Sequence, residues 1–181
     1  MRTITFVVAL MFATSVSGQQ ETAVYLTLDQ APRAVFPGAE IDRRDVASTP
    51  ELQASIKNKL GRLTPSVWEP SYVTFTARQN GQTIGYAVVV DEVGKHRPFT
   101  LIVAATPDFR VKDVAVMVYR ETRGGEITQR RFLAQYKGKR GADPIQLDRD
   151  IIGVSGATLS VQGANRAVHK ALAILQIIFG S

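Results

Sequence analysis

A run of small and hydroxylated residues is the stretch of this chain best suited to chemistry. Ser155-Gly156-Ala157-Thr158-Leu159-Ser160 precedes the last apolar segment and offers hydroxyls, backbone N–H groups and little steric bulk. It has two interpretations. Ser160 or Thr158 caps a helix in a glycine-relaxed turn, or the run binds a phosphate at a helix N-terminus, where negative charge is favoured. Taken alone, the run favours the cap, because capped turns are common.

A second polar loop has the same setting. Arg120-Glu121-Thr122-Arg123-Gly124-Gly125-Glu126 also follows an apolar stretch and precedes a helical pattern. Two such helix starts facing one site would bring together backbone N–H groups, hydroxyls and glycines, with Arg120, Arg123 and Lys137 nearby. That combination suits an organic cofactor that carries a phosphate. Because the chain offers no redox side chain of its own, any electron chemistry would belong to the cofactor.

Composition excludes several classes of site. The 181 residues include no cysteine, so a disulfide, a thiolate nucleophile and an iron–sulfur cluster are excluded. With only two histidines, a histidine-rich metal site is not expected. No P-loop, Rossmann fingerprint, nucleophile elbow or HExxH motif occurs. We therefore expect no metal site, and no catalytic residues are assigned.

The two histidines leave alternatives open. His169 lies within the last helical pattern, where a structural role is favoured over a catalytic one. His96 lies in the basic loop Gly94-Lys95-His96-Arg97, where it is either solvated or in contact with an anion. A Ser-His-Asp hydrolase is not excluded by the linear sequence.

The charge balance points to acidic partners or anionic cofactors rather than to nucleic acid. The formal net charge is +6. No run of lysine and arginine exceeds two residues, and aromatic residues do not alternate with a basic stripe, so nucleic acid is not expected as a partner.

The N-terminus has the pattern of a secretory signal. Residues 1–18 hold one basic residue, then an apolar run and then small residues. The apolar run is shorter than the roughly 20 residues that a membrane-spanning helix needs. We expect cleavage after Gly18 and an extracytoplasmic, periplasmic domain, with a retained N-terminal membrane anchor as the alternative. Residues 19–41 form an N-terminal extension in this scheme, and residues 42–181 form the domain.

Periodicity predicts an α+β fold in which helices pack on an antiparallel meander. Thr49-Pro50-Glu51 predicts the start of a helix over residues 50–60. A strand begins at Tyr72 and ends at an Asn80-Gly81 hairpin turn. Further strands follow at residues 83–91, 99–105 and 111–119, then a short helix at 127–136 and a long amphipathic helix at 160–178.

At this point the residues resemble a known family. Ser155-Gly156-Ala157-Thr158-Leu159-Ser160 resembles the SGAT-x-(S/T) flavinylation motif of FMN-binding domains. That family includes the C subunit of the sodium-pumping NADH:quinone oxidoreductase, the G subunit of the Rnf complex and stand-alone periplasmic flavoproteins. The loop Glu121–Gly125 resembles the family's Glu-Thr-x-Gly loop. Further matches to the stand-alone branch are Gly94-Lys95-His96, residues 132–139 and Asp150-Ile151, so the resemblance runs from about Asp42 to Leu175.

The resemblance implies a cofactor and a set of binding residues. A Mg²⁺-dependent flavin transferase would link FMN to Thr158 through a phosphoester bond, and redox partners such as cytochromes or membrane oxidoreductases would exchange electrons with it. The implied cofactor-binding residues are Thr158, Ser155, Gly156, Ala157, Leu159, Ser160, Glu121, Thr122, Gly124 and Gly125. One position departs from the family pattern. An aspartate is usual six residues before the flavinylated threonine, where this chain has Ile152; Asp150 then either takes over its role or attachment is less efficient.

Three functions fit these observations. The first is an exported electron-transfer flavoprotein domain, more a carrier than a self-contained enzyme. The second is an extracytoplasmic flavin-dependent reductase of a metal, a quinone or a small organic acceptor. The third is a noncovalent binding or structural domain in which residues 155–160 are only a capped turn.

Overall fold

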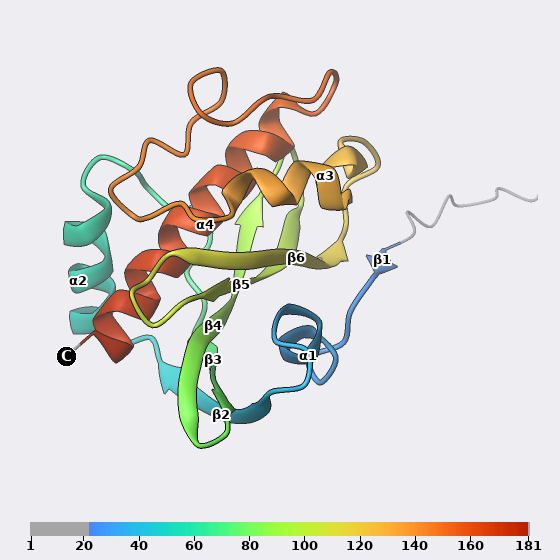
Figure 1. The fold of residues 1–181 in the computed structure, drawn as a ribbon. Coiled ribbons are helices and arrows are strands. Elements are labelled where there is room, and N and C mark those ends of the chain that lie inside the picture. Colours follow the sequence, from blue (N-terminus) through green and yellow to red (C-terminus); the bar gives the residue numbers. More distant parts are fainter. Residues whose placement is uncertain (1–21, 181) are drawn as a thin grey trace, which may run out of the picture.

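A six-stranded antiparallel sheet forms the body of the protein. The computed structural model describes residues 22–180, and the strand order is β1-β6-β5-β4-β3-β2 (Figure 1). The strands are β1 (Ala23–Val24), β2 (Glu40–Ala47), β3 (Ser71–Gln79), β4 (Gln82–Val93), β5 (Pro98–Ala105) and β6 (Val111–Tyr119). The helices are α1 (Ala31–Val35), α2 (Pro50–Leu60), α3 (Arg130–Leu133) and α4 (Thr158–Phe179), with 3₁₀ turns at Gly125–Thr128 and Ala134–Tyr136. The predicted α+β meander is confirmed.

The predicted signal peptide lies outside the described residues. Within residues 22–180, no helix is both long enough and apolar enough to cross a membrane.

The four strands from β3 to β6 follow one another through short turns, as the alternation of the sequence predicts. Asn80 and Gly81 join β3 to β4, and both have positive φ, at 50° and 76°. This is the backbone that a two-residue hairpin turn requires and that asparagine and glycine adopt most readily. Strand β6 has the predicted bounds.

Two edge strands were not predicted. Strand β2 reads EIDRRDVA and pairs with β3 along its full length, but it lies at the sheet edge and most of its residues are exposed. A charged edge strand has no apolar alternation to reveal it. Strand β1 has only two residues. The domain boundary drawn at residue 42 falls inside β2, and residues 23–41 pack on the same sheet as the rest of the chain.

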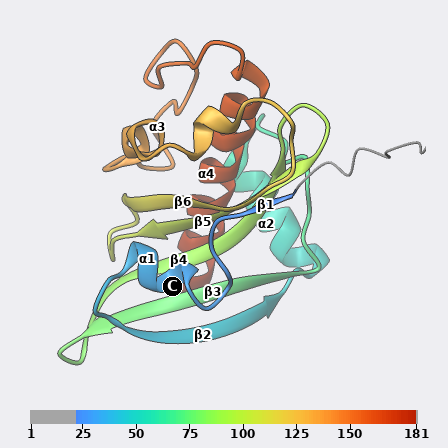
Figure 2. The ribbon, with the colours of Figure 1, turned by 90° about the vertical axis from the view of Figure 1, so that its right-hand side faces the viewer.

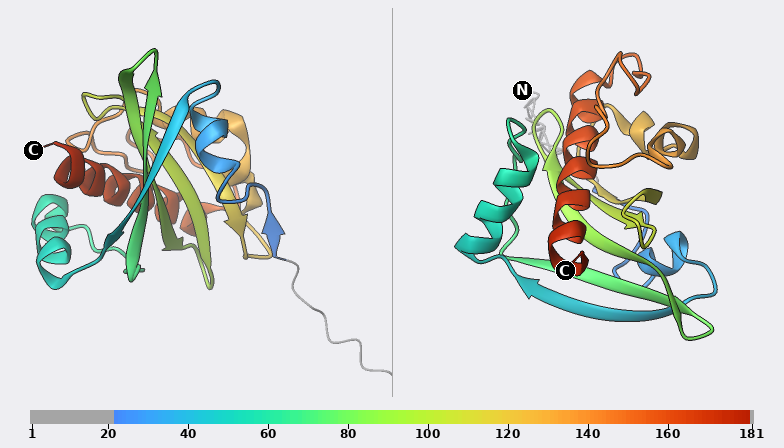
Figure 3. Two further views of the ribbon diagram at one scale, coloured as in Figure 1. Left: turned by 90° about the horizontal axis from the view of Figure 1, so that it is seen from below. Right: turned by 60° about the vertical axis from the view of Figure 1, so that its left-hand side comes forward.

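The sheet carries a core on each face, because its side chains alternate. On one face, Phe75, Ala104 and Met117 pack against α1. On the other face, Val88, Leu101 and the apolar stripe of α4 form the larger core. Figure 2 shows α1 and α4 on opposite faces of the sheet, and Figure 3 shows α2 beside α4.

A buried ionic cluster fixes the position of α4. Lys170 on α4 is fully buried, and its Nζ donates to the Val67 carbonyl at 3.0 Å, to Glu69 Oε1 at 3.0 Å and to the Asp91 carbonyl at 2.6 Å. One turn earlier, Arg166 donates to the Val93 carbonyl at 2.8 Å. If α4 moved along β4, some of these buried polar groups would lose their partners, which is costly. The contacts therefore fix the helix on β4 in one register.

One predicted helix is broken. The segment expected as a single helix at residues 127–136 is a 3₁₀ turn, the single turn of α3 and a second 3₁₀ turn. Gln129 separates the first 3₁₀ turn from α3, because its ψ of 134° is extended and interrupts the helical hydrogen bonds.

Candidate functional site

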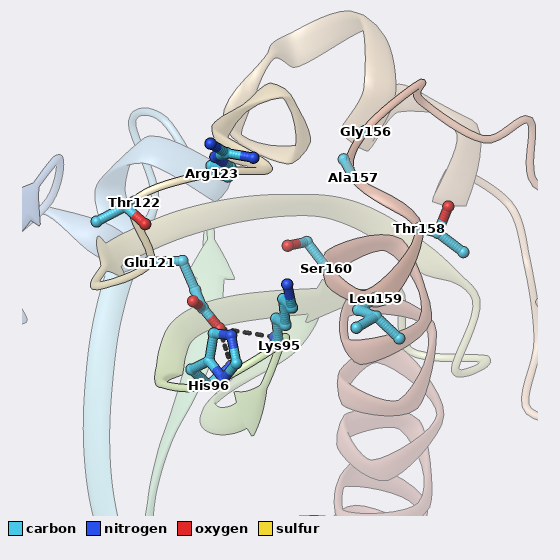
Figure 4. A pocket seen from close by; sticks show the side chains of 10 residues that line it. All are labelled: Lys95, His96, Glu121, Thr122, Arg123, Gly156, Ala157, Thr158, Leu159 and Ser160. Atoms are coloured by element: carbon cyan, nitrogen blue, oxygen red, sulfur yellow. Dashed lines mark hydrogen bonds between the residues drawn. The ribbon is translucent and has the colours of Figure 1, made fainter.

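A cavity of about 380 Å³ opens at the N-terminal end of α4 (Figure 4). It is formed where three loops meet: the β4–β5 turn, the loop after β6 and the segment before α4. Its lining residues are Lys95, His96, Glu121, Thr122, Arg123, Gly156, Ala157, Thr158, Leu159 and Ser160. The two loops that the sequence singled out therefore do face one site, with the basic β4–β5 turn as a third wall.

Hydrogen bonds through Tyr119 hold the two predicted loops together. The Tyr119 hydroxyl donates to the Arg123 carbonyl at 2.7 Å and lies 3.0 Å from Ser160 Oγ. Because a carbonyl only accepts, the Tyr119 proton is committed to Arg123, and the Ser160 hydroxyl donates to Tyr119. Burial raises the pKa of Tyr119, and this keeps the phenol protonated for the contact.

Gly124 lets the two loops approach this closely. Its φ is +81°, and a Cβ at this position would lie 2.4 Å from Ser160 Oγ. A side chain here would face both backbone strain and a clash.

The predicted cap is wrong. Helix α4 begins at Thr158, its N-cap residue is Ala157, and no side chain caps it. Ser160 lies inside the first turn and is 4% exposed, and its hydroxyl is hydrogen-bonded to the Tyr119 hydroxyl. Capping signals place a serine one position before a helix, and they do not reveal a serine that is held by a tertiary partner.

The uncapped first turn of α4 suits an anion. No side chain accepts the first backbone N–H groups of this 22-residue helix, so these groups stay free at the end that borders the cavity. The positive end of the helix dipole lies at the same place. Thr158 is exposed, and so is Leu159 at 45%. Ser155 and Gly156 form the exposed turn before them, and nothing lies within 4 Å of where a Gly156 Cβ would be.

Glu121 organises the basic turn opposite α4. Its Oε1 accepts the backbone N–H groups of Lys95 at 2.6 Å, of His96 and of Arg97 at 2.9 Å. Partial burial acts to raise the pKa of Glu121, but the three N–H donors and His96 together outweigh it, so the pKa lies below its ordinary value. Glu121 is therefore an anion that gathers three donors and fixes the turn.

Lys95 and His96 are wall residues that the sequence reasoning did not assign to the site. In Figure 4 the Lys95 side chain points toward Ser160. Only the fold shows that the basic loop lies across the cavity from Thr158. Arg120, expected nearby, instead donates to the Pro98 carbonyl and to Thr100 Oγ1, each at 3.1 Å.

Asp150 has a structural role in its loop. Its carboxylate accepts the N–H groups of Ile145 at 3.1 Å and Gln146 at 2.7 Å, and pairs with Lys139 at 2.8 Å. Ile152 is 78% exposed. The loop leading to Thr158 therefore presents an apolar side chain to solvent at the position where the motif has an acid.

Comparison with known proteins agrees with this geometry. Residues 94–173 match the FMN-binding domain, a range that begins at the basic turn, includes both loops and ends within α4. Residues 94–173 belong to the FMN-binding domain family.

A relative and a solved structure extend the comparison. The chain is 28% identical over 106 residues to the G subunit of the proton-translocating ferredoxin:NAD(+) oxidoreductase complex of Clostridium ljungdahlii, over 54% of this chain and 57% of the relative. The chain thus spans little more than half the length of that relative. The crystal structure of NqrC from Shewanella oneidensis superposes with a TM-score of 0.56 over 82% of this chain and 86% of NqrC, at 19% identity, so the fold is shared.

The cavity fits FMN by its chemistry. Lys95 and Arg123 give it a cationic wall, with the His96 ring beside them, which suits a phosphate. The helix start adds backbone donors, and the exposed Leu159 adds apolar surface. Within residues 22–180, no group of three metal-ligating side chains occurs that could hold an ion.

Proposed function

We propose that this protein is an exported electron-transfer domain that carries FMN through a phosphoester bond to Thr158. The observation that carries the proposal is the exposed Thr158 at the first residue of an uncapped helix, beside a cationic cavity. Thr158 is the exposed hydroxyl nearest to the free helical N–H groups, whereas Ser160 is buried and already bonded.

The attachment step balances with FAD as the donor. The Thr158 oxygen forms a bond to the FMN phosphorus of FAD, the pyrophosphate bond breaks, AMP leaves, and the hydroxyl proton is released. A flavin transferase would catalyse this step. The resulting phosphodiester keeps one negative charge, which the helix N-terminus stabilises by about 0.3–1 kcal/mol.

The residues of the cavity would then hold the cofactor and tune it. FMN, when bound, supplies one- and two-electron transfer. Lys95 and Arg123 favour negative charge on whatever occupies the cavity, Glu121 keeps the turn of Lys95 and His96 in place, and Thr122 offers a hydroxyl at the rim. Gly124 keeps the opposite loop close to α4, and Gly125 lies beside the Tyr119 ring in the same loop.

The tether suits a carrier outside the cytoplasm, where a dissociating cofactor would be lost. We propose residues 1–18 as the signal peptide and residues 42–181 as the FMN-binding domain, with residues 19–41 as an N-terminal extension whose described part, from residue 23, packs on the sheet of the domain. Membrane oxidoreductases are the expected redox partners, because the curated relative belongs to an oxidoreductase complex that translocates protons.

Intact-mass analysis tests the covalent link. Protein coexpressed with a flavin transferase and exported should gain the mass of FMN minus water, and Thr158→Ala should not. Thr122→Ala is the matched control, because it removes another hydroxyl of the same cavity and should keep the added mass. An unmodified wild-type protein under these conditions would contradict the proposal.

Turnover separates a carrier from a reductase. A carrier is reduced and oxidised in proportion to added redox partners. Saturable steady-state reduction of one small acceptor by the isolated loaded protein would favour the flavin-dependent reductase instead.

A further inference from the structure

A second cavity lies beside the C-terminal half of α4. Its volume is about 640 Å³, larger than that of the FMN cavity, and within the range of small-molecule sites. The C-terminal end of α2, the β5–β6 turn, the loop at residues 140–142 and α4 each contribute a wall. Ser160 lines the first cavity and Ala173 the second, so roughly 20 Å of helix separates them at 1.5 Å per residue.

The rim of this cavity carries excess positive charge. Lys59, Arg62 and Arg140 line it, and the one lining carboxylate is Asp108. Asp108 is already shared, since it pairs with Arg110 at 2.9 Å and with Arg140 at 3.5 Å. Across residues 22–180, no carboxylate lies within ion-pair distance of Lys59 or Arg62. Two cations therefore face the cavity without a counter-charge from the protein, and this attracts an anion.

The floor of the cavity is apolar. Leu60, the last residue of α2, and Leu63, which follows the helix, are only half-buried. Ala173 on α4 completes the floor, and its small side chain leaves the space open. A ligand that covers the leucines would gain roughly 25 cal/mol for each Å² of apolar surface removed from water.

We propose that this second cavity binds a small organic anion whose apolar body covers Leu60 and Leu63 and whose acidic group pairs with Lys59 and Arg62. A bare inorganic anion would leave the floor uncovered, and a neutral apolar molecule would leave the cations unpaired. The site is independent of the covalent flavin, because it shares no lining residue with the first cavity.

The test uses a matched pair of fluorescent probes on the exported chain. 8-Anilinonaphthalene-1-sulfonate has an apolar body and one anionic group, and N-phenyl-1-naphthylamine has the same body without the charge. The sulfonate should bind with one site per chain, and the neutral probe should bind about tenfold or more weakly, as expected when one ion pair in a partly desolvated site is lost. Equal affinity for the two probes, or no binding of the sulfonate, would overturn the proposal.

Charge reversals locate the site. Lys59→Glu/Arg62→Glu reverses the two exposed cations proposed to pair with the acid and should weaken sulfonate binding by about tenfold or more. Arg131→Glu/Arg149→Glu makes the same change of net charge away from the cavity and should leave the affinity within about twofold. Loss of binding in Lys95→Glu/Arg123→Glu, with retention in the first variant, would place the anion in the FMN cavity and contradict the proposal. Amide chemical shifts at Gly141 and Ala142 give a second readout and should move only when the sulfonate binds.

Discussion

At the scale of single residues, the site depends on side chains that do not touch the proposed cofactor. Ser160 and Tyr119 join α4 to the loop after β6, and Glu121 draws the basic turn toward the same place. The two loops that the sequence pointed to line one cavity. The alternative interpretation of Ser160 or Thr158 as a helix cap is wrong, because a hydroxyl near a helix start is taken for a cap until its tertiary partner is known.

The pKa of Glu121 gives a prediction for pH dependence. The pKa lies below its unfolded value because of the three N–H donors. The contact therefore stabilises the fold fully above the unfolded pKa and is lost as the pH falls through the folded pKa. In NMR titrations, the amide proton shifts of Lys95, His96 and Arg97 should move together at a pH below the ordinary glutamate range of about 4.3. Glu121→Gln should abolish this shared titration. Three amide protons that titrate independently would contradict the contact of Glu121 with all three N–H groups.

Gly124 allows the contact between the loops to be measured. Gly124→Ala should lose about 1–2 kcal/mol to the left-handed backbone and about 1–3 kcal/mol more to the clash with Ser160. Gly138 is the matched control, because its φ of +78° is similar and nothing lies within 4 Å of its Cβ direction. Urea unfolding of Gly138→Ala should show the backbone cost alone. Equal losses in the two variants would mean that the Gly124 contact with Ser160 contributes nothing.

At the scale of elements, what could be predicted follows the burial of each segment. Strands β3–β6 and helix α4 bury one face or both, so their alternation or helical period appears in the sequence. Strand β2 lies at an edge and is charged, so it leaves no periodic pattern. The apolar pattern of residues 127–136 predicts a helix, but it does not reveal the extended backbone of Gln129 just before α3. The same limit applied to the site: the sequence left open whether His96 is solvated or contacts an anion, and only the sheet places Lys95 and His96 across from Thr158.

Lys170 fixes the helix that presents Thr158. Lys170→Met should destabilise the protein by about 3–5 kcal/mol, because Glu69 and two carbonyls would lose their buried donor. The exposed Lys137→Met is the control and should change the free energy of unfolding by less than about 0.5 kcal/mol. Urea unfolding measures both variants, and a small loss in Lys170→Met would mean that helix packing alone positions α4.

At the scale of the whole molecule, the two cavities described above lie toward opposite ends of α4. The first, at its N-terminal end, falls within the region that belongs to the FMN-binding domain family. The second, near its C-terminal end, has a basic rim and an apolar floor. Because both loops of the first site attach to β6 and α4, the site is built on regular elements and held by buried contacts, as a tethered redox group requires.

The central claim is that Thr158, and no neighbouring hydroxyl, carries the cofactor. Tandem mass spectrometry of the tryptic peptide from Asp150 to Arg166 tests it directly, because that peptide contains Ser155, Thr158 and Ser160 together. After coexpression with a flavin transferase, the fragments should place the added FMN on Thr158. An unmodified peptide, or FMN on Ser155 or Ser160, would contradict the account.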